Sequence, residues 1–301
     1  MSTSLGSTSL DGRVAVVTGA GGGLGRAEAI GLAERGATVI VNDLGSSLER
    51  SDVIDVVTAA GGRAVPVAGD ISDSATATEI VRTAVDDLGS LDIVVNNAGI
   101  TRDKMLFNLT DEDWDLVIAV HLRGHFLLTR NAAAHWRALS KQTGEPVNGS
   151  IINTASEAAL LGPAAQANYG AAKAGITALT VSAARGLGRI GVRANAICPR
   201  ARTPMTAEVF GEAPDGAVDP LAPEHVVRLV NFLASDDAEK VSGQVFVVYG
   251  PQVMLMAPPT VEEVFAADGD AWDADDLAKT LGEHFADRDP GRIFSALDLI
   301  K

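Results

Sequence analysis

Cysteine is almost absent from this sequence, since Cys198 is the only one among 301 residues. A lone thiol excludes a disulfide bond within the chain and any metal cluster held by several cysteines, so we expect no bound metal. The scarcity of cysteine also fits a reducing compartment. Tyrosine is nearly as rare, with two residues in the whole chain.

Basic residues are also few. The chain has 24 lysines and arginines against 39 aspartates and glutamates, for a formal net charge of −15 and a pI of about 4.7. Such a surface repels phosphate backbones and anionic lipids, so we expect neither nucleic acid nor a membrane as partner. There is no run of about 18 apolar residues, and the opening MSTSLGSTSLDG lacks the features of a signal peptide. The sequence therefore predicts a soluble, cytoplasmic protein.

Apolar residues, in contrast, are abundant: 47% of the chain is hydrophobic, which is enough for one large core. Short runs rich in β-branched residues alternate with longer helical stretches, as in βαβ units around a parallel sheet. Most of these runs are apolar on both faces, as expected when helices cover both sides. We predict a doubly wound parallel α/β sheet of seven strands, at 13–19, 37–43, 64–70, 91–99, 149–156, 191–199 and 243–250.

The organisation of the chain follows from this alternation. Helices are expected over 24–35, 51–60, 74–88, 111–139, 166–189 and 223–233. Residues 1–11 are expected to form a mobile arm and residues 12–250 a single domain. Residues 251–301 form an acidic C-terminal extension with eleven acidic and four basic residues. Within it, 260–266 and 273–286 are expected to be short acidic helices.

A glycine-rich loop follows the first expected strand. The segment TGAGGGLG places Gly19, Gly22, Gly23 and Gly25 between a strand and a helix. Residues without a Cβ let a pyrophosphate approach the positive N-terminus of that helix. Asp43, at the end of the second strand, completes the pattern of a dinucleotide site. The alternative is a tight turn that needs glycine for steric reasons only.

Asp43 also bears on which dinucleotide binds. Its carboxylate can accept hydrogen bonds from both ribose hydroxyls of NAD and would repel the additional phosphate of NADP, so we favour NAD. The alternative role of Asp43 is a helix or turn cap. Arg26 is the one nearby residue that could serve a 2′-phosphate.

Two later strand ends carry small and polar residues. Open α/β sheets bind ligands outside the carboxyl ends of their strands. We therefore expect Asp70 to lie near the adenine ring, and Asn97, Ala98 and Gly99 to lie near the adenosine ribose. The alternative for each residue is a role in a turn.

Tyr169 and Lys173 lie one helical turn apart in NYGAAKAG, so they share a helix face. A phenol has an ordinary pKa near 10, and a nearby ammonium favours the phenolate. Tyr169 could then take a proton from an alcohol while hydride leaves carbon, or return one to a ketone. Lys173 could also hold the nicotinamide ribose. The alternative is a buried tyrosine beside a surface lysine.

Ser156 ends the fifth expected strand, at the same edge of the sheet as the glycine loop. Its hydroxyl can hold the substrate oxygen in line with the phenol of Tyr169, which contributes position and electrostatic stabilisation. A nucleophilic role is disfavoured, because the local sequence TASE lacks the G-x-S-x-G pattern.

Taken together, TGAGGGLG, Asp43, NNAG, Ser156 and YGAAK resemble the short-chain dehydrogenase/reductase family over residues 12–250. The resemblance implies a Rossmann fold, a nicotinamide cofactor, a homodimer or homotetramer, and catalysis by Tyr169 and Lys173 with support from Ser156. The cofactor site that we expect comprises Gly19, Gly22, Gly23, Leu24, Gly25, Asp43, Asp70, Ile71, Asn97, Ala98, Gly99, Tyr169, Lys173, Pro199 and Thr203.

His121 departs from the family pattern, which has an asparagine within N-x-x-G where this chain reads HLRG. His121 could replace that asparagine in a proton relay, with an imidazole near its own titration range, or it could only pack. His125 is assigned to packing. The segments WDLVIAVHLRGHF and QANYGAAKAG are similar to the hydroxyacyl-CoA dehydrogenase portion of multifunctional β-oxidation enzymes and their bacterial relatives. That similarity favours a 3-hydroxyacyl thioester substrate.

The segment CPRARTPMT keeps Pro199 and Thr203 of the family's second cofactor segment, but Arg200 replaces a glycine. Arg200 and Arg202 could bind a phosphate of the cofactor or of CoA, or they could be solvated loop residues. Residues 205–220 are expected to form a substrate lid, whose apolar Met205, Val209 and Phe210 suit an acyl or alicyclic group.

The sequence therefore predicts an NAD-dependent oxidoreductase that interconverts a secondary alcohol and a ketone, with a 3-hydroxyacyl-CoA as first choice. The alternatives are a 3-oxoacyl carrier-protein reductase, a steroid or terpenoid alcohol dehydrogenase and, from another class, a non-catalytic NAD-binding subunit. In the predicted enzyme Tyr169 is the acid/base and Lys173 lowers its pKa. Ser156 orients the substrate oxygen and His121 completes the proton relay.

Overall fold

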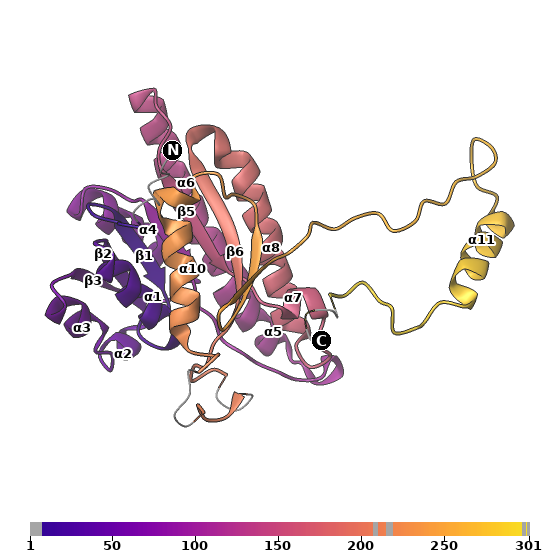
Figure 1. The fold of residues 1–301 in the computed structure, drawn as a ribbon, viewed down its shortest axis with the longest axis horizontal. Helices are drawn as coiled ribbons and strands as arrows, with labels where there is room; N and C mark the ends of the chain where they lie inside the picture. The colour runs from indigo at the N-terminus through magenta and orange to yellow at the C-terminus, as the bar shows by residue number, and fades with distance from the viewer. Residues whose placement is uncertain (1–7, 207–209, 215–218, 297–298, 300–301) are drawn as a thin grey trace, which may run out of the picture. The chain divides into compact units, whose positions relative to one another are not determined.

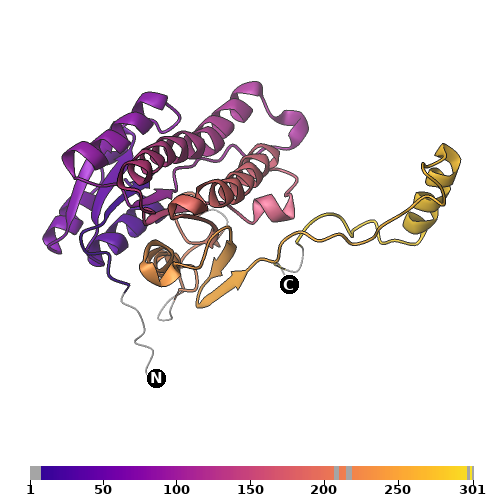
Figure 2. The same cartoon turned by 90° about the horizontal axis from the view of Figure 1, so that it is seen from above.

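The computed structural model describes residues 8–206, 210–214, 219–296 and 299. The chain divides into two compact units, residues 1–256 and 257–301. The first unit is a sheet with helices on both faces (Figure 1; Figure 2). This arrangement confirms the doubly wound α/β fold expected from the alternating sequence pattern.

Eight strands form the sheet, in the order β3-β2-β1-β4-β5-β6-β7-β8. The order reverses between β1 and β4, which is the point where open α/β sheets bind ligands. β1 to β7 pair in parallel. Their bounds are β1 (Val14–Thr18), β2 (Thr38–Asp43), β3 (Arg63–Ala68), β4 (Ile93–Asn96), β5 (Gly149–Thr154), β6 (Val192–Arg200), β7 (Val245–Tyr249) and β8 (Gln252–Leu255).

The eighth strand corrects our expectation of seven. β8 runs antiparallel to β7, with Tyr249 opposite Gln252. Between them Gly250 adopts a φ of 55°, a left-handed conformation that glycine adopts without steric cost. Three of the four residues of β8 are exposed, so it lacks the buried apolar run that marks the other strands. The sheet therefore extends past Gly250 to Leu255.

Helices cover both faces of the sheet (Figure 2). One face carries α1 (Gly23–Glu34), α3 (Val53–Ala59) and α10 (Pro223–Ala234), and the other carries α4 (Ser74–Arg82), α6 (Gly124–Thr143) and α8 (Ala167–Leu187). The shorter elements are α2 (Gly45–Leu48), η1 (Thr83–Asp87), η2 (Leu106–Asn108), α5 (Asp111–Ile118), η3 (Ala119–Arg123), α7 (Ala158–Leu161), η4 (Gly188–Ile190) and η5 (Asp236–Ala238).

The core consists of two apolar clusters, one on each side of the sheet. Because successive strand residues point to opposite faces, Ile151 packs in the cluster with α6, and Ile152 packs in the cluster with α1 and α10. Both are fully buried, and burial of each such side chain contributes about 1.5–3 kcal/mol. Trp136 anchors the α6 side, where its indole N–H donates to the carbonyl oxygen of Leu91 at 2.6 Å. The sheet is thus a rigid frame for the loops at its carboxyl edge.

A long helical segment from Asp111 to Thr143 comprises α5, η3 and α6 in succession. It begins at a capping box formed by Thr110 and Asp113 and ends before Gly144, whose φ is 78°. The η3 turn in its middle is π-helical and contains His121. Such π turns are frequent at functional sites, because they re-aim side chains relative to a regular helix.

The arm expected over residues 1–11 falls partly outside the described residues, which begin at residue 8. Leu10 is fully buried in the α1 side of the core, and its N–H donates to the carbonyl oxygen of Arg35 at 2.7 Å. The end of the expected arm is therefore part of the folded unit.

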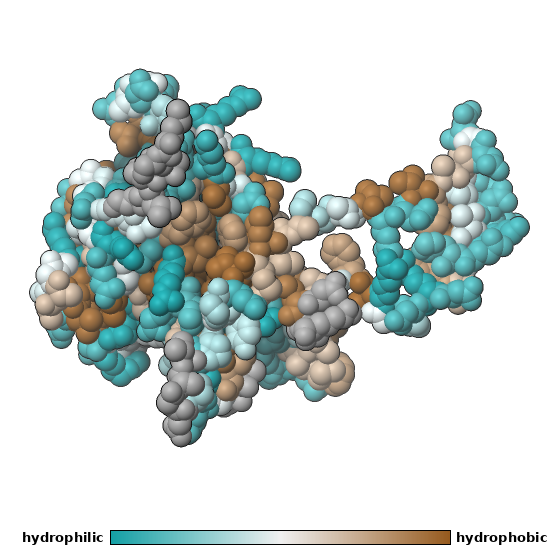
Figure 3. Space-filling model, viewed as in Figure 1, coloured by the Kyte–Doolittle hydropathy of each residue, from teal (hydrophilic) through white to brown (hydrophobic). Residues whose placement is uncertain are grey.

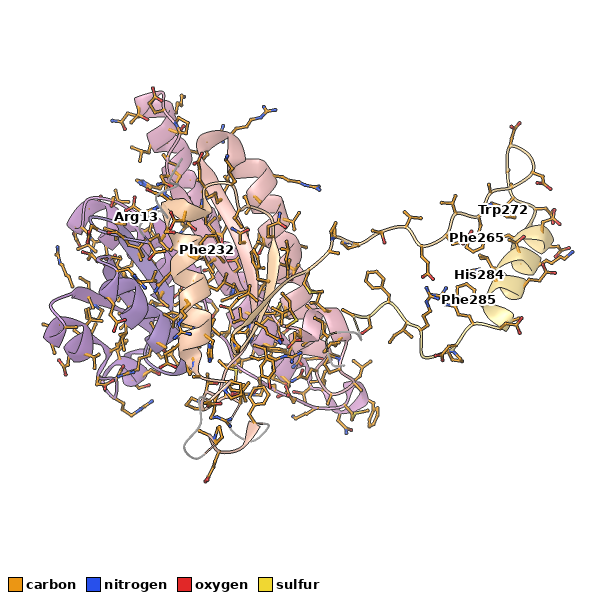
Figure 4. The ribbon with its side chains drawn as sticks, viewed as in Figure 1. Arg13, Phe232, Phe265, Trp272, His284 and Phe285 are labelled. Atoms are coloured by element: carbon orange, nitrogen blue, oxygen red, sulfur yellow. The ribbon has the colours of Figure 1, made fainter. Side chains whose placement is uncertain are left out.

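The C-terminal unit contains α11 (Ala274–Ala286), which confirms the helix expected over 273–286. Asp273 caps it by accepting a hydrogen bond from the N–H of Asp275. Residues 260–266 form no helix, contrary to our expectation, and Glu262 there pairs with Arg288. The ring of His284 packs edge to face against the rings of Phe265 and Phe285 (Figure 4).

Apolar side chains of the C-terminal unit remain exposed, and Figure 3 shows them in brown among teal polar residues. The exposed apolar residues of this unit include Val261, Val264, Phe285, Ile293 and Phe294. Across the described part of the chain, every helix is too short or too polar to cross a membrane.

Candidate active site

A cleft of about 510 Å³ opens at the carboxyl ends of the strands, and its walls come from loops after six of them. It brings together residues that are far apart in the sequence, from the glycine loop to α8. The predicted site residues that line it are Gly19, Gly22, Gly23, Leu24, Asp43, Asp70, Ile71, Asn97, Ala98, Gly99, His121, Ser156, Tyr169, Lys173, Pro199 and Thr203.

Gly25 is the one predicted residue that does not line the cleft. A Cβ at this position would lie 2.4 Å from the carbonyl oxygen of Gly19 and 2.5 Å from Nδ2 of Asn97. Gly25 therefore lets α1 approach β1 closely and sets the position of the helix N-terminus.

The N-terminus of α1 fits the pyrophosphate of a dinucleotide. Its N-cap is Gly22, which offers no side-chain cap, and its first turn contains no acidic residue. The first N–H groups of the helix consequently keep their positive partial charge for an anion. A Cβ added to Gly22 would meet no atom of the described residues within 4 Å, so this position opens onto free space.

Asp43 is held in place by the loop that it faces. Its Oδ2 accepts a hydrogen bond from the N–H of Gly21 at 2.9 Å, and its Oδ1 accepts one from the N–H of Leu44 at 2.7 Å. Each carboxylate oxygen retains a lone pair for a ribose hydroxyl. Arg26 pairs with Asp52 at 2.7 Å and is therefore engaged away from a 2′-phosphate.

The opposite wall is built from residues that both line the cleft and form turns. The hydroxyl of Thr18 accepts hydrogen bonds from the N–H groups of Asn97 and Ala98, both at 3.0 Å. Asp70 accepts one from the N–H of Ser72 at 2.8 Å. Asp70, Asn97 and Ala98 thus take part in local backbone hydrogen bonds and also line the cleft.

The catalytic candidates meet beside this wall. Tyr169 is half-buried and hydrogen-bonds to Ser156, whose hydroxyl oxygen also accepts a bond from the N–H of Ala158 at 3.1 Å. Lys173 is 2% exposed and donates from Nζ to the carbonyl oxygen of Thr154 at 2.5 Å. Its Nζ also lies over the Tyr169 ring, 5.4 Å from the centroid.

The pKa shift of Tyr169 has the opposite direction to the one we expected. Burial raises the pKa of Tyr169 above 10, and its hydrogen bond to Ser156 only partly opposes this. Burial also lowers the pKa of Lys173 from 10.5 to about 7. We expected the ammonium of Lys173 to lower the pKa of Tyr169. In this structure, loss of solvent around the phenol outweighs any such effect, and Nζ is directed to Thr154.

His121 is buried against the same cluster. Its ring stands perpendicular to that of Tyr169, with 5.2 Å between centroids. Its Nε2 lies 3.0 Å from the main-chain nitrogen of Ile100 and 2.7 Å from the oxygen of the same residue. Burial, followed by the charge of Lys173, lowers the pKa of His121 to about 3. The expectation that it titrates near its ordinary range is therefore wrong, because the imidazole stays neutral.

Arg200 and Arg202, whose roles the sequence left undecided, each form an ion pair within the chain. Arg200 holds Glu157 through both carboxylate oxygens, at 2.6 and 2.7 Å. Arg202 pairs with Asp219 at 2.9 Å. Both ion pairs favour a structural role over binding of a cofactor or CoA phosphate.

The expected substrate lid is only partly described. Met205 lines the cleft, and Phe210 is described but does not line it. Val209 lies outside the described residues. The neighbouring Thr206 also faces the cleft and donates from its hydroxyl to the carbonyl oxygen of Ala201 at 2.7 Å.

Among the lining residues that the sequence did not predict are Leu44, Ser47 and Arg50, which follow Asp43. They lie in and around α2, a helix of four residues that has no periodic signal. The one available clue was their position directly after β2, whose end carries the ligand candidate Asp43.

Residues 13–213 match the short chain dehydrogenase family. The chain is 65% identical over 302 residues to hydroxyacyl-CoA dehydrogenase ChsB1 of Mycobacterium tuberculosis, a match that covers 98% of this chain and 95% of that protein. It is 44% identical over 242 residues to peroxisomal multifunctional enzyme type 2 of Mus musculus, covering 77% of this chain and 31% of the mouse protein.

Among solved structures, a short chain dehydrogenase from Mycobacterium avium aligns with a TM-score of 0.83 at 44% identity. The alignment covers 93% of this chain and 97% of that one. The chain therefore belongs to the short-chain dehydrogenase/reductase family of oxidoreductases.

Proposed function

We propose that this enzyme is an NAD-dependent dehydrogenase that interconverts 3-hydroxyacyl and 3-oxoacyl thioesters of CoA. The observation that carries the proposal is the meeting of Ser156, Tyr169 and Lys173 in the same cleft as the glycine loop and Asp43. The choice of thioester is supported by the name of the 65% identical relative, a hydroxyacyl-CoA dehydrogenase.

Two charged residues, Asp43 and Arg26, support a preference for NAD over NADP. The carboxylate of Asp43 faces the cleft at the end of β2, where it would repel a 2′-phosphate. Arg26, the residue that the sequence offered for that phosphate, is bound to Asp52.

In the proposed mechanism the residues divide the work of binding and proton transfer. The N-terminus of α1 holds the pyrophosphate, and Asp43 holds the adenosine ribose. When bound, NAD⁺ supplies the hydride acceptor and a cationic ring. Ser156 donates a hydrogen bond to the substrate oxygen while Tyr169 removes the hydroxyl proton. Lys173 holds the nicotinamide ribose and passes the proton onward.

His121 is proposed to continue this relay as a neutral imidazole. Its Nε2 lies beside both the N–H and the carbonyl oxygen of Ile100, so it can accept from one or donate to the other. These contacts fix the orientation of the ring, and Nδ1, which has no partner among the described residues, would be the nitrogen that holds a water of the relay. A role of His121 in the relay, unlike a role in packing alone, requires that loss of its imidazole ring slows turnover.

The proposal is tested by titrating the protein with NADH and NADPH by fluorescence, and then measuring turnover with acetoacetyl-CoA. We expect tighter binding of NADH and oxidation of NADH by the thioester. Turnover of acetoacetyl carrier protein with NADPH, or of steroid and terpenoid ketones alone, would replace the substrate proposal. NADH binding with no turnover on any of these ketones would favour the non-catalytic alternative.

We also propose that the enzyme is a homodimer or homotetramer, as the family resemblance implies. Light scattering after size-exclusion chromatography measures this directly. A second protein that ends at Met256 would retain β8 and test whether the C-terminal unit is needed for assembly and activity. A monomer at micromolar concentration would contradict the proposal.

A further inference from the structure

An ion pair behind the wall of the cleft joins the segment that carries Ser156 to the neighbouring strand. Arg200, at the end of β6, holds the carboxylate of Glu157 with two nitrogens, Nη2 to Oε1 at 2.6 Å and Nε to Oε2 at 2.7 Å. Glu157 is the residue directly after Ser156. The proposed mechanism uses Ser156 but assigns no task to these two charged residues.

The ion pair is largely buried, but it stands outside the cleft. The side chains of Arg200 and Glu157 are 21% and 15% exposed. Ser156, Pro199 and Ala201 line the cleft, whereas neither member of the ion pair is among the described residues that line it. An effect of the ion pair on the reaction would therefore pass through the residues beside it.

Tyr249 adds a third strand end to this arrangement. It lies opposite Arg200 in the register of β6 and β7, and the guanidinium lies over its ring at 5.1 Å from the centroid. A guanidinium is planar, so it can bind a carboxylate with two nitrogens and also stack on an aromatic ring. The side chain of Arg200 thus ties the ends of β6 and β7 to the segment after β5.

Glu157 also fixes the start of α7. It is the residue before that helix, and its carbonyl oxygen accepts hydrogen bonds from the N–H groups of Leu160 and Leu161, both at 2.8 Å. The next residue, Ala158, is buried. A shift of Glu157 would therefore carry the first turn of α7 with it.

The first turn of α7 in turn contacts the catalytic pair. The N–H of Ala158 donates to the hydroxyl oxygen of Ser156 at 3.1 Å, and Ser156 hydrogen-bonds to Tyr169. A Cβ on Gly170, the residue after Tyr169, would lie only 3.3 Å from the carbonyl oxygen of Ala158. Ser156 and Tyr169 are thus held where α7 meets α8.

An ion pair of this kind is better suited to fixing a position than to adding stability. Taking two charges out of water can cost as much as their attraction returns, whereas two parallel hydrogen bonds impose one geometry. We propose that Arg200 is a positioning residue: through Glu157 it holds the hydroxyl of Ser156 in place beside the phenol of Tyr169. The inference rests on the proposed catalytic roles of Ser156 and Tyr169.

The charged and titratable groups around Tyr169 come from other elements. They are Lys173 on α8, His121 on η3, Cys198 on β6 and Asp103 between β4 and η2. The hydrogen bond to Ser156 is the contribution that lowers the pKa of Tyr169, whereas burial is the largest contribution that raises it. Weakening of this bond would therefore raise the pKa, and the phenolate that accepts the alcohol proton would form at higher pH.

The pKa of Tyr169 can be measured without any substrate, by ¹³C NMR of protein labelled at the tyrosine ring carbon that carries the oxygen. The chain has two tyrosines, and Tyr249→Phe assigns both signals. We expect Arg200→Lys and Glu157→Gln to raise the pKa of Tyr169, because lysine is a single point of contact and glutamine lacks the charge. An unchanged pKa in both variants would overturn the inference, whatever substrate the enzyme uses.

Kinetics test whether Arg200 acts through Ser156. We expect Arg200→Lys to lower kcat for alcohol oxidation by about tenfold and to move the acid limb of the pH profile of kcat/KM to higher pH, with nearly unchanged affinity for NADH. In a Ser156→Ala background the same substitution should change neither quantity further. An equal effect in both backgrounds would overturn the inference, because the charge of the ion pair would then act on Tyr169 directly.

Arg193→Lys is the matched control, because Arg193 is a buried arginine at the other end of the same strand. Its guanidinium donates to the carbonyl oxygens of Leu233 and Ser235, at 2.9 and 3.1 Å. Both substitutions should lower the midpoint of thermal unfolding, but only Arg200→Lys should move the acid limb. A limb that moves equally in both variants would contradict the positioning role, because lost stability alone would then produce the effect.

These outcomes are independent of the proposed substrate. Failure of acetoacetyl-CoA would overturn only the substrate proposal, because the NMR measurement needs no substrate and the kinetics can use any alcohol that the enzyme oxidises. If Arg200→Lys does not fold, Glu157→Gln decides by the same two measurements.

Discussion

Gly99 and His121 occupy adjoining space: a Cβ on Gly99 would lie 2.3 Å from Cε1 of His121 and 3.0 Å from its Nδ1. The histidine that replaces the family's asparagine thus fits only because residue 99 has no side chain. The last residue of the NNAG segment therefore sets the position of the proposed relay group, in addition to lining the cleft.

Gly99→Ala is expected to displace the ring of His121 and to lower kcat about as much as His121→Ala does, on the order of tenfold to a hundredfold. Steady-state kinetics with a fluorescence measurement of NADH affinity separates this from loss of cofactor binding. Gly186→Ala is the control, since a Cβ there meets nothing within 4 Å among the described residues. Equal kcat for Gly99→Ala and wild type would contradict the relay role.

Asp43→Ala is expected to weaken NADH binding by about a hundredfold and to leave NADPH binding no tighter than in wild type. The carboxylate that would select against a 2′-phosphate also fixes the N–H of Gly21 in the glycine loop. Each charge-assisted hydrogen bond contributes about 1.5–3 kcal/mol, so its removal loosens the loop for both cofactors. Fluorescence titration with each nucleotide checks this. A marked gain in NADPH affinity would contradict this, because repulsion of the 2′-phosphate would then outweigh the support that Asp43 gives to the loop.

Ser156→Ala is expected to lower kcat and to move the acid limb of the pH profile for alcohol oxidation to higher pH. The hydrogen bond from Ser156 is the contribution that lowers the pKa of Tyr169. Without it the phenolate forms only at higher pH, because burial continues to raise that pKa. The profile of kcat/KM against pH for both enzymes gives the answer, and an unshifted limb would refute this view of Ser156.

Glu28→Gln is expected to stabilise the protein at alkaline pH and to have little effect near pH 4.5. Glu28 is fully buried, and burial raises its pKa from 4.5 to about 8. Between these values the unfolded chain has released the proton and the folded chain has not. Wild-type stability therefore falls as pH rises through this window, by an amount on the order of a few kcal/mol.

Denaturant unfolding of wild type and Glu28→Gln at pH 5 and pH 8.5 measures this effect. The difference between the two proteins isolates Glu28 from Lys173, whose lowered pKa of about 7 makes stability rise with pH above neutrality. A difference that does not grow with pH would contradict the buried, neutral state of Glu28.

Most of the fold and of the site could be predicted from local sequence patterns. The seven parallel strands have apolar runs in the sequence. Gly19, Asp43, Ser156 and Tyr169 each lie at a fixed place relative to a strand end or within a helix. Because parallel strands end at one edge, their order along the chain was enough to gather these residues in one cleft. The edge strand β8, which is exposed at three of its four residues, had no such pattern.

The burial of individual side chains and their ion pairs could not be predicted from the sequence in this way. The low pKa of His121 arises from packing against Gly99 and from Lys173, which is distant in sequence. The ion pair of Arg200 with Glu157 likewise joins the end of β6 to the residue before α7, which is distant in sequence. A sequence shows which groups can ionise, but the protein surroundings that shift their pKa exist only in the folded chain.

The measurement that tests the central claim most directly is the rate of NADH formation from NAD⁺ and 3-hydroxybutyryl-CoA by wild type and by Tyr169→Phe. Loss of the phenol oxygen removes the acid/base group and leaves the ring that packs against His121. We expect the variant to lose about 10²- to 10⁴-fold in kcat while it binds NADH with nearly unchanged affinity. Turnover by Tyr169→Phe at the wild-type rate would contradict the assignment of this cleft as the catalytic centre.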